Sequence, residues 1–235
     1  MSRRLAVFDI DGTIFRWTFI AELLTTLTKK GIFSPDIIKQ TEKTYLEWKD
    51  RHGSWDDYIN TVVSVTNNAL IGKNEEEVNK AITEMIDYKK NNLYIFTRDL
   101  INKLKLEDYY LLAISASPEK IIAGFTKFLG FDKYFGTIYE VKDGKFTGRE
   151  LNEIIVNKHN ILANFLLENP QVVLKDSIGV GDSASDIPFL KMIEKPIAFN
   201  PDRKLAEYAK EKEWRIVVER KSVIYDIKDF EVLEK

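Results

Sequence analysis

The stretch Leu5–Phe15, LAVFDIDGTIF, combines a short apolar run with two carboxylates and a glycine. The run Leu5–Phe8 is typical of a buried strand, and Asp9 and Asp11 follow directly at its end. Residues two apart in an extended segment point to the same side, so we expect both carboxylates to share one side of the strand end. Neighbouring carboxylates repel each other, which leaves two interpretations: a cation binds there, or the pair belongs to a solvated turn.

The hydrophobic pattern changes directly after this strand. Apolar residues recur at helical spacing from Trp17 to Leu27, and Ser34-Pro35, Ser54 and Asn74 are typical helix starts. This pattern predicts about four helices before Lys90, with no strand between them.

Strands and helices alternate in the rest of the chain. Strands are predicted at 110–115, 137–141, 145–147, 177–180, 196–199 and 215–218, and helices at 117–129, 153–167 and 186–193. Asp143-Gly144 is a strong hairpin signal. The alternation predicts an α/β fold with a Rossmann-like parallel sheet, whose ligand site lies at the carboxyl ends of the strands. We expect two domains: a core of residues 1–15 and 91–235, and an inserted helical domain of residues 16–90.

Composition excludes several classes of function. The chain has 235 residues, a formal net charge of −2 and no cysteine, so we expect neither a basic nucleic-acid surface nor thiolate chemistry. The residues before the first strand are too few for a signal peptide, and no apolar run approaches the roughly 20 residues of a membrane span. These features predict a soluble, cytoplasmic protein that binds neither nucleic acid nor membrane.

Polar residues follow the predicted strands at several places. Ser115 ends one strand, and Asp182 and Asp186 follow another. Ser117 is expected to cap the next helix, while Ser115 faces the site. Lys158 lies on the helix before the Asp182 strand, where a lysine is ordinarily solvated, so only its place in this order gives it weight.

A divalent cation would explain the carboxylates. The carboxyl ends of parallel strands share one edge of a sheet, so Asp182 can meet Asp9 and Asp11 there. Three clustered carboxylates without a cation would raise one another's pKa values and destabilise the fold. Magnesium prefers oxygen ligands and keeps coordination positions for water and phosphate. The pattern therefore predicts a Mg²⁺ site.

These residues resemble the haloacid dehalogenase superfamily of phosphohydrolases. Its four motifs stand here in order: Asp9-Ile10-Asp11-Gly12-Thr13, Ser115, Lys158 and Gly181-Asp182-Ser183-Ala184-Ser185-Asp186. The helical insert resembles the C1 cap of that superfamily. The segments ISASPEK, VKDGKFTG and VGDSASDIPFL are similar to the phosphoserine phosphatase-like branch, subfamily IB.

The resemblance implies a role for each motif residue. Asp9 is the nucleophile, and Asp11 is the general acid and base. Asp9, the Asp11 carbonyl and Asp182 would hold magnesium. Asp186 would orient Lys158 or a metal-bound water. The residues expected to bind phosphate or substrate are Thr13, Ser115, Ala116, Lys158 and Ser185. Of these, Ala116 and Ser185 differ from the glycine and asparagine usual in the branch, and Thr13 is also a candidate hydrogen-bond partner of the nucleophile.

The resemblance implies a magnesium-dependent phosphomonoesterase that acts on a small phosphorylated metabolite through an aspartyl-phosphate. A phosphotransferase or mutase of the same fold is the alternative, followed by a non-catalytic phosphate-binding protein. The branch's name does not fix the substrate, because the acidic residue expected after the first motif is Thr18 here, and GSWDDYINTVV (residues 53–63) lacks the expected arginine. Substitutes for these two residues are sought among Arg16, Glu22 and Arg51. Four aromatic residues suggest an aromatic-lined cap pocket, although ordinary packing would also explain them: Trp17, Phe19, Trp48 and Trp55.

Overall fold

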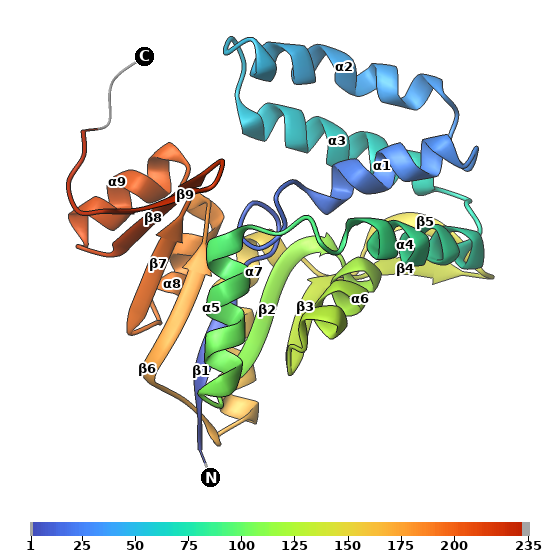
Figure 1. Ribbon diagram of the computed structural model, residues 1–235. Coiled ribbons are helices and arrows are strands. Elements are labelled where there is room, and N and C mark those ends of the chain that lie inside the picture. The colour runs from blue at the N-terminus through green and yellow to red at the C-terminus, as the bar shows by residue number, and fades with distance from the viewer. Residues whose placement is uncertain (1, 232–235) are drawn as a thin grey trace.

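A computed structural model describes residues 2–231 of the chain. Its centre is a seven-stranded sheet in the order β3-β2-β1-β6-β7-β8-β9, in which only the edge strand β9 runs antiparallel to its neighbour (Figure 1). The strands of this sheet are β1 (Arg3–Phe8), β2 (Tyr110–Pro118), β3 (Lys133–Thr137), β6 (Val172–Gly181), β7 (Lys195–Phe199), β8 (Arg215–Arg220) and β9 (Val223–Ile227). The helices are α1 (Phe19–Lys29), α2 (Asp36–Lys49), α3 (Trp55–Leu70), α4 (Glu75–Lys89), α5 (Ile95–Leu106), α6 (Glu119–Leu129), α7 (Ile154–Glu168), α8 (Ile187–Leu190) and α9 (Arg203–Glu211).

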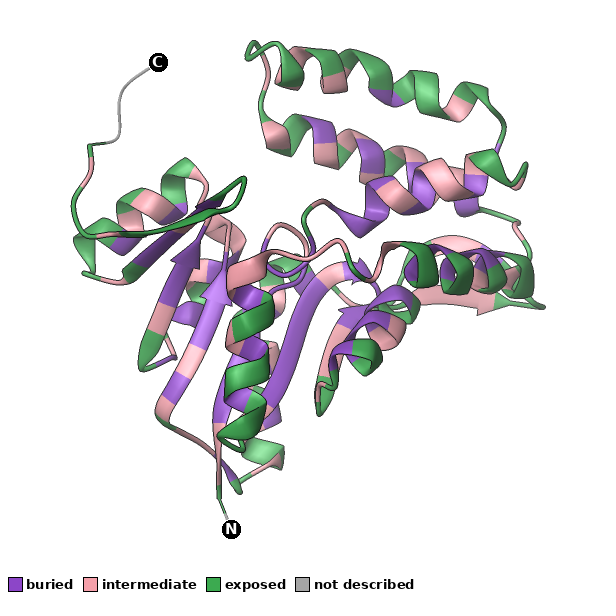
Figure 2. Ribbon diagram, viewed as in Figure 1, coloured by how far each residue is buried: buried purple, intermediate pink, exposed green. Residues whose placement is uncertain are grey.

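Strand β1 lies in the middle of the sheet. It pairs in parallel with β2 on one side and β6 on the other, with Phe8 opposite both Ala113 and Val180. Its last four residues are fully buried, and Figure 2 shows the central strands buried along most of their length. This register brings the segments that follow β1, β2 and β6 to one edge of the sheet, as the strand pattern predicted.

Helices cover both faces of the sheet, because alternate residues of β1 enter different hydrophobic cores. Ala6 and Phe8 pack in the core that includes residues of α5 and α6. Leu5 and Val7 pack in the core that includes residues of α7, α8 and α9. This two-sided burial is what the short apolar strands of a parallel sheet require. The predicted α/β fold with a parallel sheet is confirmed.

The helices α1 to α4 lie beyond the carboxyl edge of the sheet (Figure 1) and are here called the helical layer. Helix α4 packs against α6 as well as against α1. Two predicted N-caps are confirmed: Ser54 Oγ accepts from the Asp57 N–H at 3.0 Å, and Asn74 Oδ1 accepts from the Glu77 N–H at 3.0 Å. The helical layer occupies the part of the chain in which the apolar spacing predicted helices without strands.

The chain enters and leaves the helical layer through two segments that pair with each other. Arg16 N–H donates to Asn92 O at 2.9 Å, and Tyr94 N–H donates to Ile14 O at 3.0 Å. Phe15 and Leu93 form an antiparallel bridge between these two bonds. The connection to the sheet is therefore a short two-stranded ribbon.

A hairpin of β4 (Tyr139–Lys142) and β5 (Lys145–Glu150) forms a second sheet. Its turn residues Asp143 and Gly144 have φ values of 48° and 71°, as the sequence signal required. Glu75 N–H donates to Gly144 O at 2.8 Å, so the hairpin is joined to the helical layer at the start of α4.

Several elements differ from the sequence prediction. Helix α5, strand β3, helix α9 and strand β9 were not predicted. The predicted helix at 186–193 is instead a 3-10 turn over Ala184–Asp186 followed by the short α8. Within residues 2–231, none of the helices combines the length and hydropathy needed to cross a bilayer.

Candidate active site

Asp9 and Lys158 form a buried ion pair at the end of β1. Lys158 extends from α7, and its Nζ lies 2.6 Å from Asp9 Oδ1 and 2.5 Å from Asp186 Oδ1. The Lys158 side chain is only 3% exposed, whereas a lysine on an amphipathic helix is ordinarily solvated. A charge this deeply buried is stable only between opposite charges, and the two aspartates supply them.

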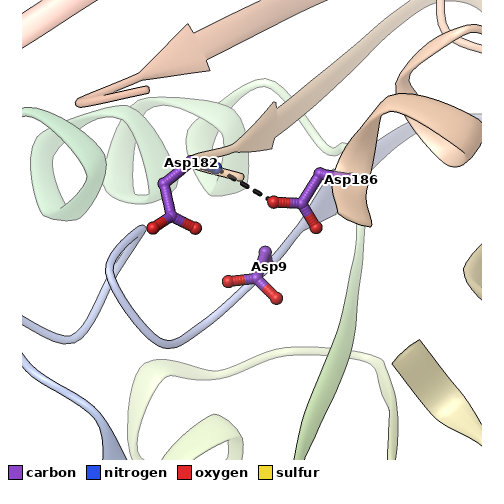
Figure 3. A group of neighbouring side chains, drawn as sticks. All are labelled: Asp9, Asp182 and Asp186. Carbon is purple, nitrogen blue, oxygen red and sulfur yellow. Dashed lines mark hydrogen bonds between the residues drawn. The ribbon is translucent and has the colours of Figure 1, made fainter. Parts of the chain in front are cut away.

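Three aspartates surround this position and are here called the acidic cluster: Asp9, Asp182 and Asp186. One carboxylate oxygen from each lies within 4.8 Å of the others, and Figure 3 shows Asp9, from the end of β1, facing Asp182 and Asp186 from the segment after β6. Thr13 donates from Oγ1 to Asp182 Oδ1 at 3.2 Å. Thr13 thus contacts Asp182 and not the Asp9 carboxylate, so the expected hydrogen bond to the nucleophile is replaced by a bond to Asp182.

The Asp186 carboxylate is occupied by protein donors on both oxygens. Oδ1 accepts from Lys158, and Oδ2 accepts from the N–H groups of Asp182 and Ser183, each at 3.0 Å. These bonds form a capping box that starts the 3-10 turn after β6. Asp186 therefore fixes the loop that carries Asp182 and also holds Lys158 toward Asp9.

Asp11 points to a different set of partners from Asp9. Its Oδ1 accepts from the Phe19 N–H at 2.6 Å, and its Oδ2 accepts from Ser115 Oγ at 3.1 Å and Ser117 Oγ at 2.7 Å. Asp9 and Asp11 thus have separate hydrogen-bond partners, although they lie close enough for the charge of Asp11 to raise the pKa of Asp9. Strand β1 ends at Phe8, so strict alternation no longer applies at Asp11.

Ser117 does not cap α6, so the prediction that it caps this helix is wrong. Strand β2 continues through Pro118, which pairs with Thr137 of β3, and α6 begins at Glu119 without a side-chain cap. The Ser117 N–H donates to Ser115 Oγ at 3.0 Å, and the Ser117 hydroxyl is used on Asp11.

Burial and mutual repulsion dominate the electrostatics of the acidic cluster. Burial raises the pKa of Asp9 from 3.8 to about 8, despite the opposing charge of Lys158. Burial, together with the charges of Asp9 and Asp186, raises the pKa of Asp182 well above its ordinary value. Burial alone would lower the pKa of Lys158, but Asp186 and Asp9 outweigh it and raise that pKa. One lysine thus leaves the cluster short of positive charge.

Gly12 allows the loop after β1 to pass against Asp182. Its φ is +79°, and a Cβ placed on it would lie 2.1 Å from Asp182 Oδ2 and 2.8 Å from Asp182 Cγ. Any side chain at this position would therefore displace the carboxylate as well as strain the backbone.

We expect Gly12→Ala to lower both stability and activity. Gly31→Ala is the matched control, because Gly31 has a φ of +73° but a Cβ placed on it would meet nothing within 4 Å. Gly31→Ala should lower the unfolding free energy by only about 1–2 kcal/mol, which is the cost of holding a residue with a Cβ in the left-handed region. Gly12→Ala should cost more in urea unfolding, and should slow any reaction that depends on the position of Asp182 at least about tenfold. Equal effects of the two substitutions would contradict this interpretation.

The remaining predicted residues have partners outside the acidic cluster. Ala116 is in β2 between Ser115 and Ser117, and its carbonyl accepts from Thr137 Oγ1 at 2.7 Å. Ser185 Oγ lies 2.9 Å from Ser183 Oγ, in the loop after β6. Glu22 is paired with Lys89 at 2.9 Å, and the Arg16 guanidinium stacks over Tyr94.

Aromatic side chains gather where α2 ends, α3 begins and the loop before α1 passes. The ring centroids of Trp17 and Trp55 are 5.3 Å apart, and those of Trp48 and Trp55 are 4.7 Å apart. This group is here called the aromatic cluster and consists of Trp17, Tyr45, Trp48, Trp55 and Tyr58. Its three tryptophans are partly exposed, so their rings are not fully used by packing. Phe19, by contrast, is fully buried against Phe15 and Phe125.

Comparison with known proteins shows the family to which this chain belongs. A family model described as haloacid dehalogenase-like hydrolase matches residues 6–191. The chain belongs to the haloacid dehalogenase-like hydrolase family. The predicted family and the expectation of a hydrolase are confirmed, and the match includes the segments that carry Asp9, Ser115, Lys158 and Asp182.

Individual proteins also match over nearly the whole chain. The histidinol-phosphatase of Neisseria meningitidis serogroup C (strain 8013) is 27% identical over 224 residues, which cover 92% of this chain and 98% of that protein. A crystal structure of a protein with unknown function from Bordetella pertussis Tohama I has a TM-score of 0.74 at 20% identity, covering 92% of this chain and 98% of that one. A structure described as a phospho-aspartyl intermediate analogue of phosphoserine phosphatase has a TM-score of 0.63 at 23% identity, covering 94% and 96%. The two structures support the shared fold.

Proposed function

We propose that the protein is a magnesium-dependent phosphomonoesterase that acts through an aspartyl-phosphate on Asp9. The observation that carries this proposal is the buried Lys158 held between Asp9 and Asp186, beside Asp182, at the carboxyl edge of the sheet. Asp9 has a buried cation and a second acidic side chain, Asp182, beside it. This arrangement is suited to phosphoryl transfer, in which catalysis is mostly positioning and charge stabilisation.

The donor set fits a hard divalent cation. Lys158 occupies Asp9 Oδ1 and Thr13 occupies Asp182 Oδ1, while no donor within residues 2–231 bonds to Oδ2 of either aspartate. Asp186 has no oxygen left without a protein donor. Asp9 and Asp182, with the Asp11 carbonyl, would therefore hold Mg²⁺, whereas Asp186 would act by orienting Lys158. When bound, the metal supplies positive charge that neutralises the phosphoryl oxygens and the nucleophile.

In this proposal the reaction proceeds in two steps. In the first, an Asp9 oxygen bonds to phosphorus as the bond to the ester oxygen breaks, and Asp11 gives that oxygen a proton. In the second, water bonds to phosphorus as the bond from Asp9 breaks, and Asp11 takes the proton of the water. Lys158 and Ser115 stabilise the phosphoryl charge. Thr13, Ala116 and Ser185 border the substrate.

We propose that the helical layer, residues 16–90, serves as a cap domain over a core of residues 1–15 and 91–235. The aromatic cluster lies at the turn between α2 and α3, beside the loop that leads from Asp11 to α1. Partly exposed tryptophans at such a place are suited to stacking on a flat leaving group. A cap in this position would also limit the access of bulk water.

Histidinol phosphate is the first substrate to test. The relative of that name matches the helical layer as well as the sheet, because it covers 92% of this chain. The leaving group carries an imidazole that can stack on the aromatic cluster, and it has no carboxylate that would require the arginine missing from residues 53–63. L-Phosphoserine, with a carboxylate and no ring, is the matched comparison.

The assay is release of inorganic phosphate with and without magnesium. We expect hydrolysis of p-nitrophenyl phosphate, and a kcat/KM for histidinol phosphate at least about tenfold above that for L-phosphoserine. Product analysis with added alcohols distinguishes the alternative phosphotransferase, which would give a new phosphate ester. Absence of magnesium-dependent hydrolysis from every substrate would refute the proposal.

Magnesium and protons should compete at the acidic cluster. Since burial raises the pKa of Asp9 from 3.8 to about 8, the folded protein keeps a proton that the unfolded chain has lost in this range. The unfolding free energy of the metal-free protein should therefore fall as pH rises from about 5 to 8. A bound cation removes this penalty, so magnesium should raise the melting temperature more at pH 8 than at pH 6.

The measurement is thermal unfolding at both pH values in EDTA or in excess magnesium, at constant ionic strength. At 100 times its dissociation constant, magnesium should add about 2.7 kcal/mol of stability. Asp182→Asn is the control, because it removes one proposed metal ligand and should abolish most of the gain. The same gain at both pH values would contradict this coupling.

A further inference from the structure

Ser117 has a buried hydroxyl to which the proposed mechanism has given no role. The residue is 6% exposed and lies at the end of β2, where it does not cap α6. Its Oγ donates to Asp11 Oδ2 at 2.7 Å, closer than the 3.1 Å of Ser115. The shortest hydroxyl contact of Asp11 is thus made by a residue outside the four motifs.

The other contacts of Asp11 show why a second hydroxyl is needed. Oδ1 is held by the Phe19 N–H at 2.6 Å, so Oδ2 is the oxygen that the two serines orient. In the proposed reaction Ser115 turns to a phosphoryl oxygen, and its bond to Asp11 is then lost. Ser117 remains as the hydroxyl on Oδ2.

We propose that Ser117 is a positioning residue that holds the Asp11 carboxyl group in line for proton transfer. This inference rests on the proposed function, in which Asp11 is the acid and base. A serine hydroxyl can donate to one lone pair of a carboxyl oxygen while the acid proton on that oxygen is directed at the leaving group, and it can still donate after that proton has left. Ser117 can therefore stay bonded to Asp11 in both steps.

The leaving group gives a readout that a structural role would not move. Nitrophenolate leaves without a proton, so p-nitrophenyl phosphate needs little help from Asp11 in the first step. An alkyl phosphate such as n-propyl phosphate leaves as a basic alkoxide and depends on that proton. Single-turnover release of nitrophenol or propanol from excess enzyme with magnesium isolates this step.

We expect Ser117→Ala to slow propanol release by about 30-fold or more and nitrophenol release by less than about threefold. Ser117→Thr keeps the hydroxyl and should recover most of the propanol rate. Thr137→Val is the matched control, because Thr137 Oγ1 supports the same end of β2 through Ala116 O at 2.7 Å and makes no hydrogen bond to Asp11. If Thr137→Val slows the enzyme, it should slow propanol release and nitrophenol release by the same factor.

Equal losses on both substrates in a folded Ser117→Ala protein, as in the control, would overturn the inference. If Ser117→Ala does not fold, the two substrates are compared in Ser117→Cys, whose thiol is only a weak donor, and equal losses on both substrates in that variant would overturn the inference equally. A native protein that releases neither product in magnesium would instead refute the proposed function, so the two failures are distinguishable.

Discussion

Asp9→Asn should abolish turnover while leaving the protein folded. The amide has the shape of the carboxylate and can still accept from Lys158, which retains its 2.5 Å pairing with Asp186. It cannot form the acyl phosphate, however, and removing a covalent nucleophile is expected to lower kcat by about 10⁴-fold or more. Burial raises the pKa of the Asp9 carboxyl group to about 8, so ionising it lowers the stability of the folded protein. Removing this carboxyl group should therefore not lower the melting temperature at pH 8.

Two measurements check this result. Phosphate release from p-nitrophenyl phosphate gives the loss of turnover, and acid-quenched mass spectrometry locates the phosphoryl group on the peptide that carries Asp9. Asp132→Asn is the control, since Asp132 pairs with Arg3 at 2.7 Å and lies at the start of β3, the opposite end from the site. Its turnover should stay within about twofold. A phosphoryl group found on another aspartate, or turnover that survives Asp9→Asn, would refute the mechanism.

Lys158→Met should damage both stability and catalysis. Methionine fills a similar volume, but it leaves Asp9 and Asp186 buried without a counter-charge. Breaking a buried ion pair from one side typically costs about 3–5 kcal/mol of unfolding free energy. Hydrolysis should fall by about 10³-fold, because the phosphoryl charge loses its cation.

An exposed ion pair supplies the control for Lys158→Met. Lys195 lies 2.6 Å from Asp176, but the two side chains are 56% and 39% exposed. Lys195→Met should change the unfolding free energy by about 1 kcal/mol or less and leave hydrolysis unchanged. Urea unfolding of both variants at pH 7.5 makes the comparison. If Lys158→Met and Lys195→Met lower the unfolding free energy equally, the buried ion pair of Lys158 does not stabilise the site.

The central strands and the helical layer were predictable because their patterns are local. Strand β1 is a short apolar run between polar residues, and α3 and α4 begin at side-chain caps that the sequence displays at Ser54 and Asn74. Two of the missed elements differ in this respect. Helix α9 begins at a side-chain cap like those of α3 and α4, because Asp202 Oδ1 accepts from the Leu205 N–H at 2.7 Å, so its signal was present in the sequence and was overlooked. In β9 four of the five residues are exposed, so no apolar pattern marks this strand, and pairing with β8 defines it.

The site shows the same division. The order of the motif residues indicated which side chains belong together, and the structure gathers Asp9, Lys158, Asp182 and Asp186. Their individual partners could not be read from the order. The sequence Ser117-Pro118-Glu119 is a good local helix start, but pairing of Pro118 with Thr137 extends the strand and frees the Ser117 hydroxyl for Asp11. Their roles in catalysis stay predictions.

The paired segments between the sheet and the helical layer also have a mechanical consequence. A single strand would let the layer swivel in any direction, but here the two crossings are tied together by the bonds from Arg16 to Asn92 and from Tyr94 to Ile14. The layer is also fixed to the β4-β5 hairpin, where Gly144 O accepts from the Glu75 N–H and Asn67 bonds to both Glu150 and Tyr139. These two attachments together restrict how the layer can rotate against the sheet. Since one strand of the ribbon leads directly from Asp11 to Trp17, any shift of the layer that reaches the ribbon would be felt at both the Asp11 loop and the aromatic cluster.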